Sequence, residues 1–423
     1  MSSKDEKKPR RRSPGEGGVF EYKLANGKTQ FGIKFMVPQP DGTKKPVLRR
    51  RDDEGRPWTT RAAAQKAVRE ALSKVDKGEF IEPSKQTTGG YLDDWANGLR
   101  KADSTVASYK KNIRLHLKPY IGSIPLASLT SAKITALYVM LEKEGMRDGK
   151  GELIGEGLSA RTVRYIHTIL RSALQAAVDA EPALLAKNSA DKAKPPTAKE
   201  AKAPEMHPWN DEQLRTFLDW SRQNSALHSA WLVLAYTGIR RGELLALRWR
   251  DLDLDKGKMS VRRSVGLIRV KGEGKKIQEG TTKSCKARVI DLDPATVALL
   301  RQHKKERGGL ALKLAQGDAL VFGDHEGVWR HPERFSRTFK EHLARCRREL
   351  AKQGIEPPPD IRLHDLRHTH ATIMLIAGVN PKIVSERLGH STVSITLDIY
   401  SHCLPTIQRE AVERFAAIMG GNG

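Results

Sequence analysis

The sequence predicts a multidomain, mainly α protein: a small α+β N-terminal module, an all-α domain and a larger mixed α/β domain that is mostly helical. Three observations support this fold class. The chain has 423 residues, enough for two or three domains. Alternation of apolar and polar residues, typical of strands, is confined to residues 19–51 and 251–292. Elsewhere apolar residues recur mostly at helical spacing, and proline-rich or glycine-rich stretches separate the parts.

The charge indicates a polyanionic partner, with nucleic acid as the default. Lys and Arg number 75 against 50 Asp and Glu, a formal net charge of +25. No apolar run reaches the roughly 18 residues of a spanning helix. The charged N-terminus lacks the apolar region of a secretory signal. An anionic membrane surface is the rival partner, but the lack of a spanning run leads us to expect no membrane partner. Three scattered cysteines suit a reducing cytosol.

The N-terminal region begins with a basic tail, residues 1–18, which we expect to be disordered. Residues 19–80 predict a three-stranded sheet and one helix. Asn26-Gly27 indicates a two-residue type I′ turn, Asp41-Gly42 a second turn, and Thr59 or Thr60 a helix cap. A basic sheet face can enter a major groove, although a solvated α+β module is the alternative. The DNA-binding candidates here are Lys34, Arg49, Arg50 and Arg51.

An all-helical domain is predicted over residues 88–186, with helices at 91–99, 104–117, 130–145 and 159–180. The last helix carries an apolar stripe and, on another face, three arginines. These arginines either contact DNA backbone or form ordinary soluble surface; they are Arg161, Arg164 and Arg171. Residues 187–208 lack periodicity and hold four prolines, so we expect an extended linker.

Residues 209–423 predict the mixed domain. Asn210 or Asp211 should cap its first helix, and residues 271–286 read as a polar loop. After Pro405 a last helix carries an apolar stripe that we expect to pack on a neighbouring subunit. The remaining elements are strands within 251–254, 258–270 and 287–292, and helices at 210–224, 227–236, 242–249, 294–306, 334–350, 364–378, 381–388 and 392–402.

A polar skeleton stands out within the apolar segment from residue 363 to residue 402. It consists of His364 and Arg367 at i,i+3, His390 after Leu388-Gly389, and Tyr400. His364 and His368 have the spacing of a zinc pair, but no Glu occupies the HExxH position and no third ligand is evident. The hypothesis is that Tyr400 is a nucleophile aimed at a phosphate.

Five motifs in order, TGIRRGEL, TTKSCKARVI, HDLRH, LGH and DIYSH, resemble the tyrosine recombinase family in its phage-type integrase form. The resemblance is close from Trp209 onward. It extends more loosely over the helical domain, which is similar to the family's core-binding domain, and the N-terminal module looks like the arm-type DNA-binding domain of larger integrases. The resemblance implies six catalytic residues, with Glu243 bracing the first: Arg240, Lys283, His364, Arg367, His390 and the nucleophile Tyr400.

The chemistry of these residue types fits phosphoryl transfer. Arginine binds phosphate bidentately and keeps its proton, so Arg240 and Arg367 can replace a metal ion. A tyrosine with its usual pKa of about 10 needs help to lose its proton. The resemblance implies that His364 assists there, that His390 hydrogen-bonds the phosphate, and that Lys283 protonates the departing 5′ oxygen. We expect no cofactor, because a phosphotyrosine bond retains the energy for rejoining.

Two assignments compete with neighbours in sequence. Arg241 adjoins Arg240, and only the TG-x-R frame favours Arg240. Lys283 lies in a lysine-rich loop, and the T-K-S sequence followed by Arg288 favours it. The competing lysines are Lys275, Lys276 and Lys286.

The resemblance implies a site-specific recombinase that integrates and excises a mobile element in the bacterial cytoplasm, associated with the nucleoid. Its partners would be core-type and arm-type attachment sites on double-stranded DNA, three further copies in a tetramer that forms a Holliday junction, a host DNA-bending protein and an excision directionality factor. A type IB topoisomerase, a chromosome-dimer resolvase and a noncatalytic DNA-binding protein of this fold are the alternatives.

Overall fold

The chain forms two compact units, residues 1–203 and 204–423. The computed structural model describes residues 17–38, 43–52, 55–76, 86–148, 151–202, 206–270, 274–281, 287–400, 412–413 and 415–419. Residues 1–16 of the predicted basic tail and the Asp41-Gly42 turn lie outside these ranges, and Gly18 begins a strand. In the part of the chain that is described, every helix is too short or too polar to cross a bilayer.

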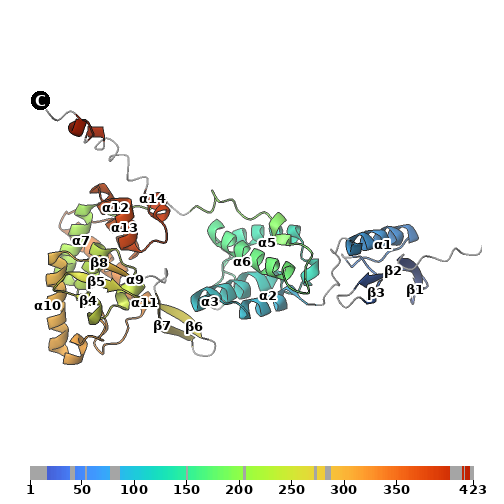
Figure 1. Cartoon of the computed structure of the whole chain (residues 1–423), viewed down its shortest axis with the longest axis horizontal. Coiled ribbons are helices and arrows are strands. Elements are labelled where there is room, and N and C mark those ends of the chain that lie inside the picture. The colour runs from blue at the N-terminus through green and yellow to red at the C-terminus, as the bar shows by residue number, and fades with distance from the viewer. Residues whose placement is uncertain are drawn as a thin grey trace, which may run out of the picture. The chain divides into compact units, whose positions relative to one another are not determined.

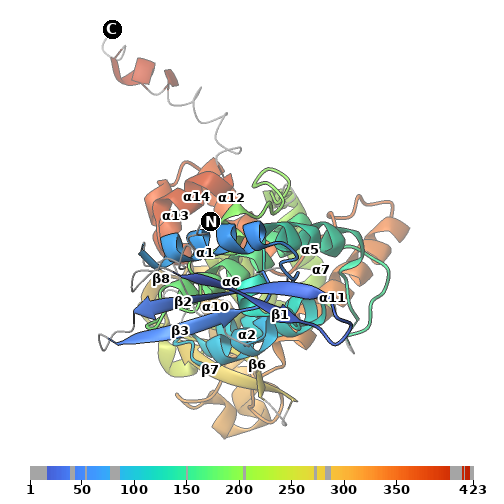
Figure 2. The same cartoon turned by 90° about the vertical axis from the view of Figure 1, so that its right-hand side faces the viewer.

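The first unit begins with a three-stranded antiparallel sheet in the order β1-β2-β3. Helix α1 packs along one face of it (Figures 1 and 2). Thr60 accepts a hydrogen bond from the first turn of α1, as predicted. The first turn differs from the prediction, because Leu24 N donates to Lys28 O and leaves a three-residue loop. The elements are β1 (Gly18–Lys23), β2 (Thr29–Pro38), β3 (Lys44–Arg49) and α1 (Arg61–Asp76).

A separate apolar core holds the helical part of this unit. The stripe of α6 is its centre, because every predicted stripe residue of that helix is fully buried. Helix α3 continues into a π-helical turn, η1, and then into α4. The elements are α2 (Thr88–Asn97), α3 (Asp103–Asn112), η1 (Ile113–Leu117), α4 (Lys118–Ile121), η2 (Leu126–Ser128), α5 (Ser131–Glu144) and α6 (Ala160–Val178).

The connection after α6 differs from the predicted extended linker in its first part. Residues Ser189–Lys192 form a 3₁₀ turn, η3. Ala190 and Ala193 are buried in the core of the helical part. Asn188 donates to Arg171 O and accepts from Ala190 N, which pins the segment to α6. Small side chains and a capping Asn gave no periodic signal, so the sequence concealed this packing.

The second unit is mostly helical with two small sheets, in the orders β4-β5-β8 and β6-β7. Asn210 and Gln213 form a reciprocal capping box at α7. The elements are α7 (Asp211–Asn224), α8 (His228–Thr237), α9 (Arg241–Leu245), η4 (Trp249–Asp251), β4 (Leu252–Asp253), β5 (Lys258–Val261), β6 (Arg263–Val270), β7 (Gly274–Thr281), β8 (Arg288–Asp291), α10 (Pro294–Leu310), η5 (Leu312–Ala315), α11 (Pro332–Lys352), α12 (Asp365–Ile376), α13 (Pro381–Leu388) and α14 (Val393–Tyr400). The predicted mainly helical multidomain fold is confirmed.

The prediction of a polar loop over residues 271–286 is wrong for β7. This strand pairs antiparallel with β6 along its whole length, and the two form a hairpin (Figure 1). Ile277 is the one bulky apolar residue of β7, and it packs against the main core. A two-stranded ribbon needs few apolar residues when most of its surface is solvated, so its composition resembles that of a loop.

Candidate active site

Arg240 is placed by a tight turn between α8 and α9. Gly238 ends α8 with φ +63°, in the left-handed region. A Cβ there would lie 2.6 Å from Leu388 Cδ2 and 2.7 Å from His370 Cδ2, so only glycine fits. Arg240 follows in an extended conformation as the N-cap of α9. The glycine of the TG-x-R motif is therefore required by packing, because α8 ends there against side chains of α12 and α13.

Glu243 accepts two hydrogen bonds from Arg240. Arg240 Nη1 donates to Glu243 Oε1 at 2.9 Å, and its backbone N donates to Oε2 at 3.0 Å. Arg240 Nη2 donates to Gly389 O at 3.1 Å. Burial alone would raise the pKa of Glu243, but its bonds to Arg288 and Arg240 outweigh burial and hold that pKa below its ordinary value.

Arg367 lies in the first turn of α12 and is only 3 % exposed. Its Nη1 donates to Gly238 O at 2.8 Å, two residues before Arg240. Arg367 is thus anchored on the turn that carries Arg240. A guanidinium with fixed acceptors keeps its orientation before substrate arrives.

Two histidines adjoin these arginines. His364 is the N-cap residue of α12; desolvation and the charge of Arg367 lower its pKa. His390 follows the C-cap of α13, and its Nδ1 lies 2.8 Å from Thr396 Oγ1. Desolvation, then Arg367 and Arg240, lower the pKa of His390 to about 4. Both imidazoles are therefore neutral near pH 7 and can accept or donate a single proton.

The remaining predicted catalytic residues are described less completely. Tyr400 is the last residue of α14, which follows His390 directly in the chain; the structure describes its backbone and not its side chain. Lys283 lies outside the described residues, between the end of β7 and the start of β8. The catalytic roles of both stay predictions.

The structure separates Arg240 from its sequence neighbour. Arg241 points toward α11, where its Nη1 donates to Ser336 Oγ at 2.7 Å. Arg240 alone of this pair bonds Glu243 and Gly389. His364 and His368 pack edge to face with ring centroids 5.1 Å apart. Within the described residues, no cluster of three or more His, Cys, Asp or Glu side chains is arranged to bind a metal ion.

Comparison with known proteins assigns the family. Residues 209–406 match the phage integrase family, and residues 91–140 match the phage integrase N-terminal SAM-like domain. The chain belongs to the phage integrase family of tyrosine recombinases. It is therefore a DNA breaking-and-rejoining enzyme of site-specific recombination.

Similar proteins include integrases from several kinds of mobile element. The recombinase is 26 % identical to a XerC-like tyrosine recombinase of Caldanaerobacter subterraneus, over 92 % of this chain and 96 % of that protein. It is 27 % identical to the ICEBs1 integrase of Bacillus subtilis, over 71 % and 74 %. The fold resembles that of the Tn1549 transposon integrase solved with transposon right end DNA, with a TM-score of 0.62 and 22 % identity, covering 78 % of this chain and all of that one.

The DNA-binding candidates of the N-terminal sheet lie on different surfaces. Lys34 lies on the face away from α1, opposite Leu48. Arg49 pairs opposite Ile33 and so belongs to the face that α1 covers. Arg50 stacks on Tyr22 with its Cζ 4.9 Å from the ring centroid, and Arg51 donates to Gly55 O. The expected basic face is thus a mixed face, where basic residues alternate with apolar and aromatic side chains.

Two of the three arginines on α6 have partners within their own unit. Arg164 Nη1 donates to Pro196 O at 2.7 Å. Arg171 Nε donates to Asp191 Oδ1 at 2.7 Å. Arg161 is exposed near the start of the helix. DNA contact by these three residues stays a prediction, and the first two have an evident structural role.

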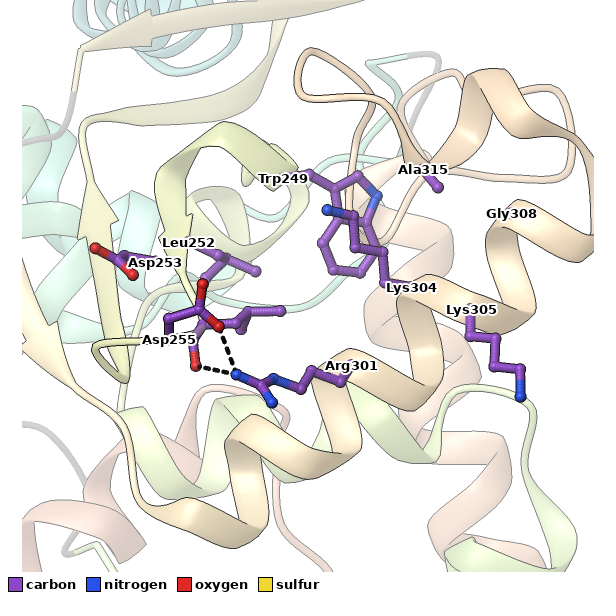
Figure 3. Close-up of a pocket in the computed structure, with 10 residues that line it drawn as sticks. Trp249, Leu252, Asp253, Asp255, Arg301, Lys304, Lys305, Gly308 and Ala315 are labelled. Atoms are coloured by element: carbon purple, nitrogen blue, oxygen red, sulfur yellow. Dashed lines mark hydrogen bonds and ion pairs between the residues drawn. The ribbon is translucent and has the colours of Figure 1, made fainter.

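A hollow of about 680 Å³ is lined by the β4–β5 turn and by α10, and none of the predicted catalytic residues lines it. Figure 3 shows Arg301 of α10 reaching Asp255 and the backbone carbonyl of Leu254, and Lys304 over the Trp249 ring. These contacts fasten α10 to the turn. Its arginine is a useful comparison, since it bonds a carbonyl and a carboxylate as Arg240 does but outside the active site.

Sequence reasoning missed two arginines of the site, Arg288 and Arg387. Arg288 donates to both oxygens of Glu243. Arg387 donates to Asp291 O, Tyr236 O and His370 Nε2. In β8, strand alternation puts Arg288 on the inner face with Ile290, which is 2 % exposed, whereas Val289 between them is 60 % exposed.

Proposed function

We propose that this recombinase integrates and excises a mobile element by attack of Tyr400 on a DNA phosphate, through a covalent 3′-phosphotyrosine intermediate and a Holliday junction. The observation that carries the proposal is the pair Arg240 and Arg367, each anchored on a backbone carbonyl beside a neutral histidine. Such an arrangement supplies positive charge and proton transfer to one phosphate.

The arginines stabilise the charge that develops on the nonbridging oxygens. Their guanidinium groups already have fixed acceptors, so the transition state requires little reorganisation of the pocket. The carboxylate of Glu243 offsets one positive charge of the cluster and fixes the orientation of the Arg240 side chain. The unused N–H groups of Arg240, whose side chain is 24 % exposed, remain for phosphate.

The histidines and Lys283 move the protons. Neutral His364 accepts the proton that Tyr400 loses as its oxygen attacks phosphorus. If Nδ1 of His390 accepts from Thr396, its proton is on Nε2, where it donates to a phosphate oxygen. Lys283 protonates the leaving 5′ oxygen, and the same steps in reverse rejoin the strand.

The proposed partners are two kinds of DNA site and further copies of the chain. The net charge of +25 favours DNA over neutral partners. Two protomers would bind inverted core sites and four would exchange strands, with the N-terminal sheet on separate arm sites. Exposed apolar residues in the C-terminal helical segment support docking on a neighbouring subunit: Val412, Phe415, Ile418 and Met419. A host DNA-bending protein and an excision directionality factor complete the proposal.

The test uses a pool of nicked duplexes of randomised sequence, in which cleavage near the nick traps the enzyme on DNA. Wild-type protein should give SDS-stable adducts whose sequencing defines a selected duplex. Tyr400→Phe should bind that duplex and give no adduct, because phenylalanine has no nucleophilic oxygen.

Three outcomes would contradict the proposal. Adducts that persist in Tyr400→Phe would assign the nucleophile to another residue. Efficient relaxation of a supercoiled plasmid that lacks the selected sequence would favour the topoisomerase alternative. A wild-type protein that binds the pool but never forms an adduct would favour the noncatalytic alternative.

A further inference from the structure

Arg288 belongs to a closed ring of hydrogen bonds beside the active site. Its Nη2 donates to Glu243 Oε2 at 2.7 Å and its Nη1 to Glu243 Oε1 at 3.2 Å. Its Nε donates to Arg387 O at 2.9 Å. Its side chain is only 10 % exposed. The three nitrogens of this guanidinium therefore donate to three oxygen atoms of two residues, Glu243 in α9 and Arg387 in α13.

The ring closes through Arg240. Glu243 accepts from Arg240 as well as from Arg288, and Arg240 donates in turn to Gly389 O. Gly389 lies two residues after Arg387 and one before His390. The ring thus runs from α9 through β8 to the end of α13 and back, and it includes Gly389, the residue just before His390.

Gly389 is shaped to this arginine. It has φ +69°, in the left-handed region. A Cβ there would lie 2.9 Å from Arg288 Nη1 and 3.0 Å from its Cζ. The glycine of the LGH motif therefore serves two purposes: it ends α13, and it leaves room for the guanidinium beneath its backbone.

We propose that Arg288 is a positioning residue for strand cleavage, which orients Arg240 through Glu243 and through the chain from Arg387 to Gly389. It would not touch the DNA itself. Resting on the proposed function, this inference adds a residue that acts only through others. The fork geometry is the essential property, because an ammonium group is a single point and cannot make three diverging bonds.

Charge balance gives the ring a second consequence. A single buried carboxylate is shared by two guanidinium groups, so loss of Arg288 would leave Glu243 free to draw Arg240 away from phosphate. Arg288→Lys keeps the charge and loses the fork, which makes it the decisive variant. A displacement of Arg240 by about 1 Å is enough to slow the chemical step by about 100-fold.

The experiment measures single-turnover adduct formation on the selected nicked duplex. We expect Arg288→Lys to bind the duplex within about threefold of wild type and to form adduct about 100-fold more slowly. Arg301→Ala is the matched control, since Arg301 also bonds a carbonyl and a carboxylate but lies at the separate hollow. It should cleave at the wild-type rate.

A substrate change distinguishes positioning from general damage. A methylphosphonate at the scissile position lacks one anionic oxygen, so its transition state depends less on Arg240. The deficit of Arg288→Lys should shrink to within about threefold on that duplex. In addition, Arg240→Lys combined with Arg288→Lys should be no slower than Arg240→Lys alone, because both act through one group.

Three results would overturn the inference: wild-type cleavage by Arg288→Lys, an equal deficit on phosphate and methylphosphonate, or additive effects in the double variant. Thermal unfolding checks that the variant is folded. If it is not, Gly389→Ala approaches the ring from the other side and must show the same substrate dependence. Failure of wild-type protein to form any adduct would contradict the proposed function instead, so the two failures are distinct.

Discussion

Two arginine-rich regions of this recombinase differ in how their charges are held. Around Glu243, the guanidinium groups of Arg240, Arg288 and Arg367 are largely buried and bonded to fixed oxygens. Along α6, Arg171 is paired with Asp191, but the side chains are 54 % and 45 % exposed. Both regions look equally basic in the sequence. The difference shows that a buried arginine with fixed hydrogen-bond acceptors is better prepared for catalysis than an exposed one, whatever the number of positive charges nearby.

The anchored arginines also differ in what holds them. In the active site, Arg367 donates to Gly238 O and Arg240 donates to Gly389 O. Both carbonyls lie at the ends of helices. Arg164 of α6 also ends on a carbonyl, Pro196 O, but this carbonyl belongs to the connecting segment. The first set therefore fixes a pocket, and the second fixes a linker. Substitutions in each region should have effects of very different size.

The largest effect is expected at Arg367. Arg367→Ala should slow adduct formation by about 100- to 1,000-fold, because it removes a preorganised donor to the phosphate. Arg367→Lys should recover only part of the rate, since lysine lacks the fork. Single-turnover assays on the selected duplex give both rates. Arg161→Ala, on the surface of α6, is the control; a comparable rate loss there would contradict the distinction between the two regions.

Glu243→Gln should come next, with a loss of stability of about 3 kcal/mol. The carboxylate is 1 % exposed and bonds two guanidinium groups. Glutamine is nearly isosteric but uncharged, so it leaves Arg240 and Arg288 to repel each other without compensation. Chemical denaturation measures the change. An unaltered free energy of unfolding would mean that the cluster relaxes into solvent, and that the pocket is less rigid than its contacts indicate.

Local sequence rules predicted much of this pocket and missed its connections. The motif order identified Arg240, Glu243 and the helix beginning near His364. Strand alternation could have placed Arg288 inward, but nothing local indicates what it meets there. Its contact with Glu243 spans 45 residues, and that of Arg240 with Gly389 spans 149. Such pairs depend on how helices pack, and a single sequence read by itself carries no record of that.

The missed strand and the missed packing of residues 189–193 have another cause. β7 is polar because a two-stranded ribbon is mostly solvated, and η3 is held by alanines and a capping asparagine. Neither produces an apolar period. The helices α6 and α11 were predicted with nearly correct ends because each has a wide apolar stripe. Predictability therefore followed the amount of apolar surface that an element buries.

A smaller effect should appear in the dependence of stability on pH. His370 is buried, with Nδ1 2.9 Å from Ala235 O and Nε2 accepting from Arg387 Nε at 3.2 Å. Desolvation and then Arg387 lower its pKa from 6.5 to about 3. Below pH 6.5, His370 binds a proton in the unfolded chain and stays neutral in the folded chain. The stability from this residue is thus complete above pH 6.5 and declines as the pH falls toward 3.

His370→Gln should remove this dependence, since glutamine can donate and accept without titrating. We expect the free energy of unfolding to fall less steeply between pH 6.5 and 4.5, by up to about 1.4 kcal/mol per pH unit. Denaturant titrations across that window provide the slope. His325→Gln is the control, because that side chain is 85 % exposed. Equal slopes for wild type and His370→Gln would show that His370 binds a proton in the folded protein as readily as in the unfolded chain.

The smallest effect is expected on α6, where the comparison began. Arg171→Ala breaks the exposed pair with Asp191, which should contribute no more than about 0.5 kcal/mol to stability. A double-mutant cycle with Asp191→Ala isolates that interaction, and high salt should reduce it further. DNA affinity of the same variants supplies the second half of the test. If Arg171→Ala weakens binding to the selected duplex while Asp191→Ala strengthens it, the pair competes with phosphate, and the role of Arg171 in holding the segment is secondary. If neither changes affinity, the arginines of α6 are structural, and contact with DNA backbone must come from other basic residues.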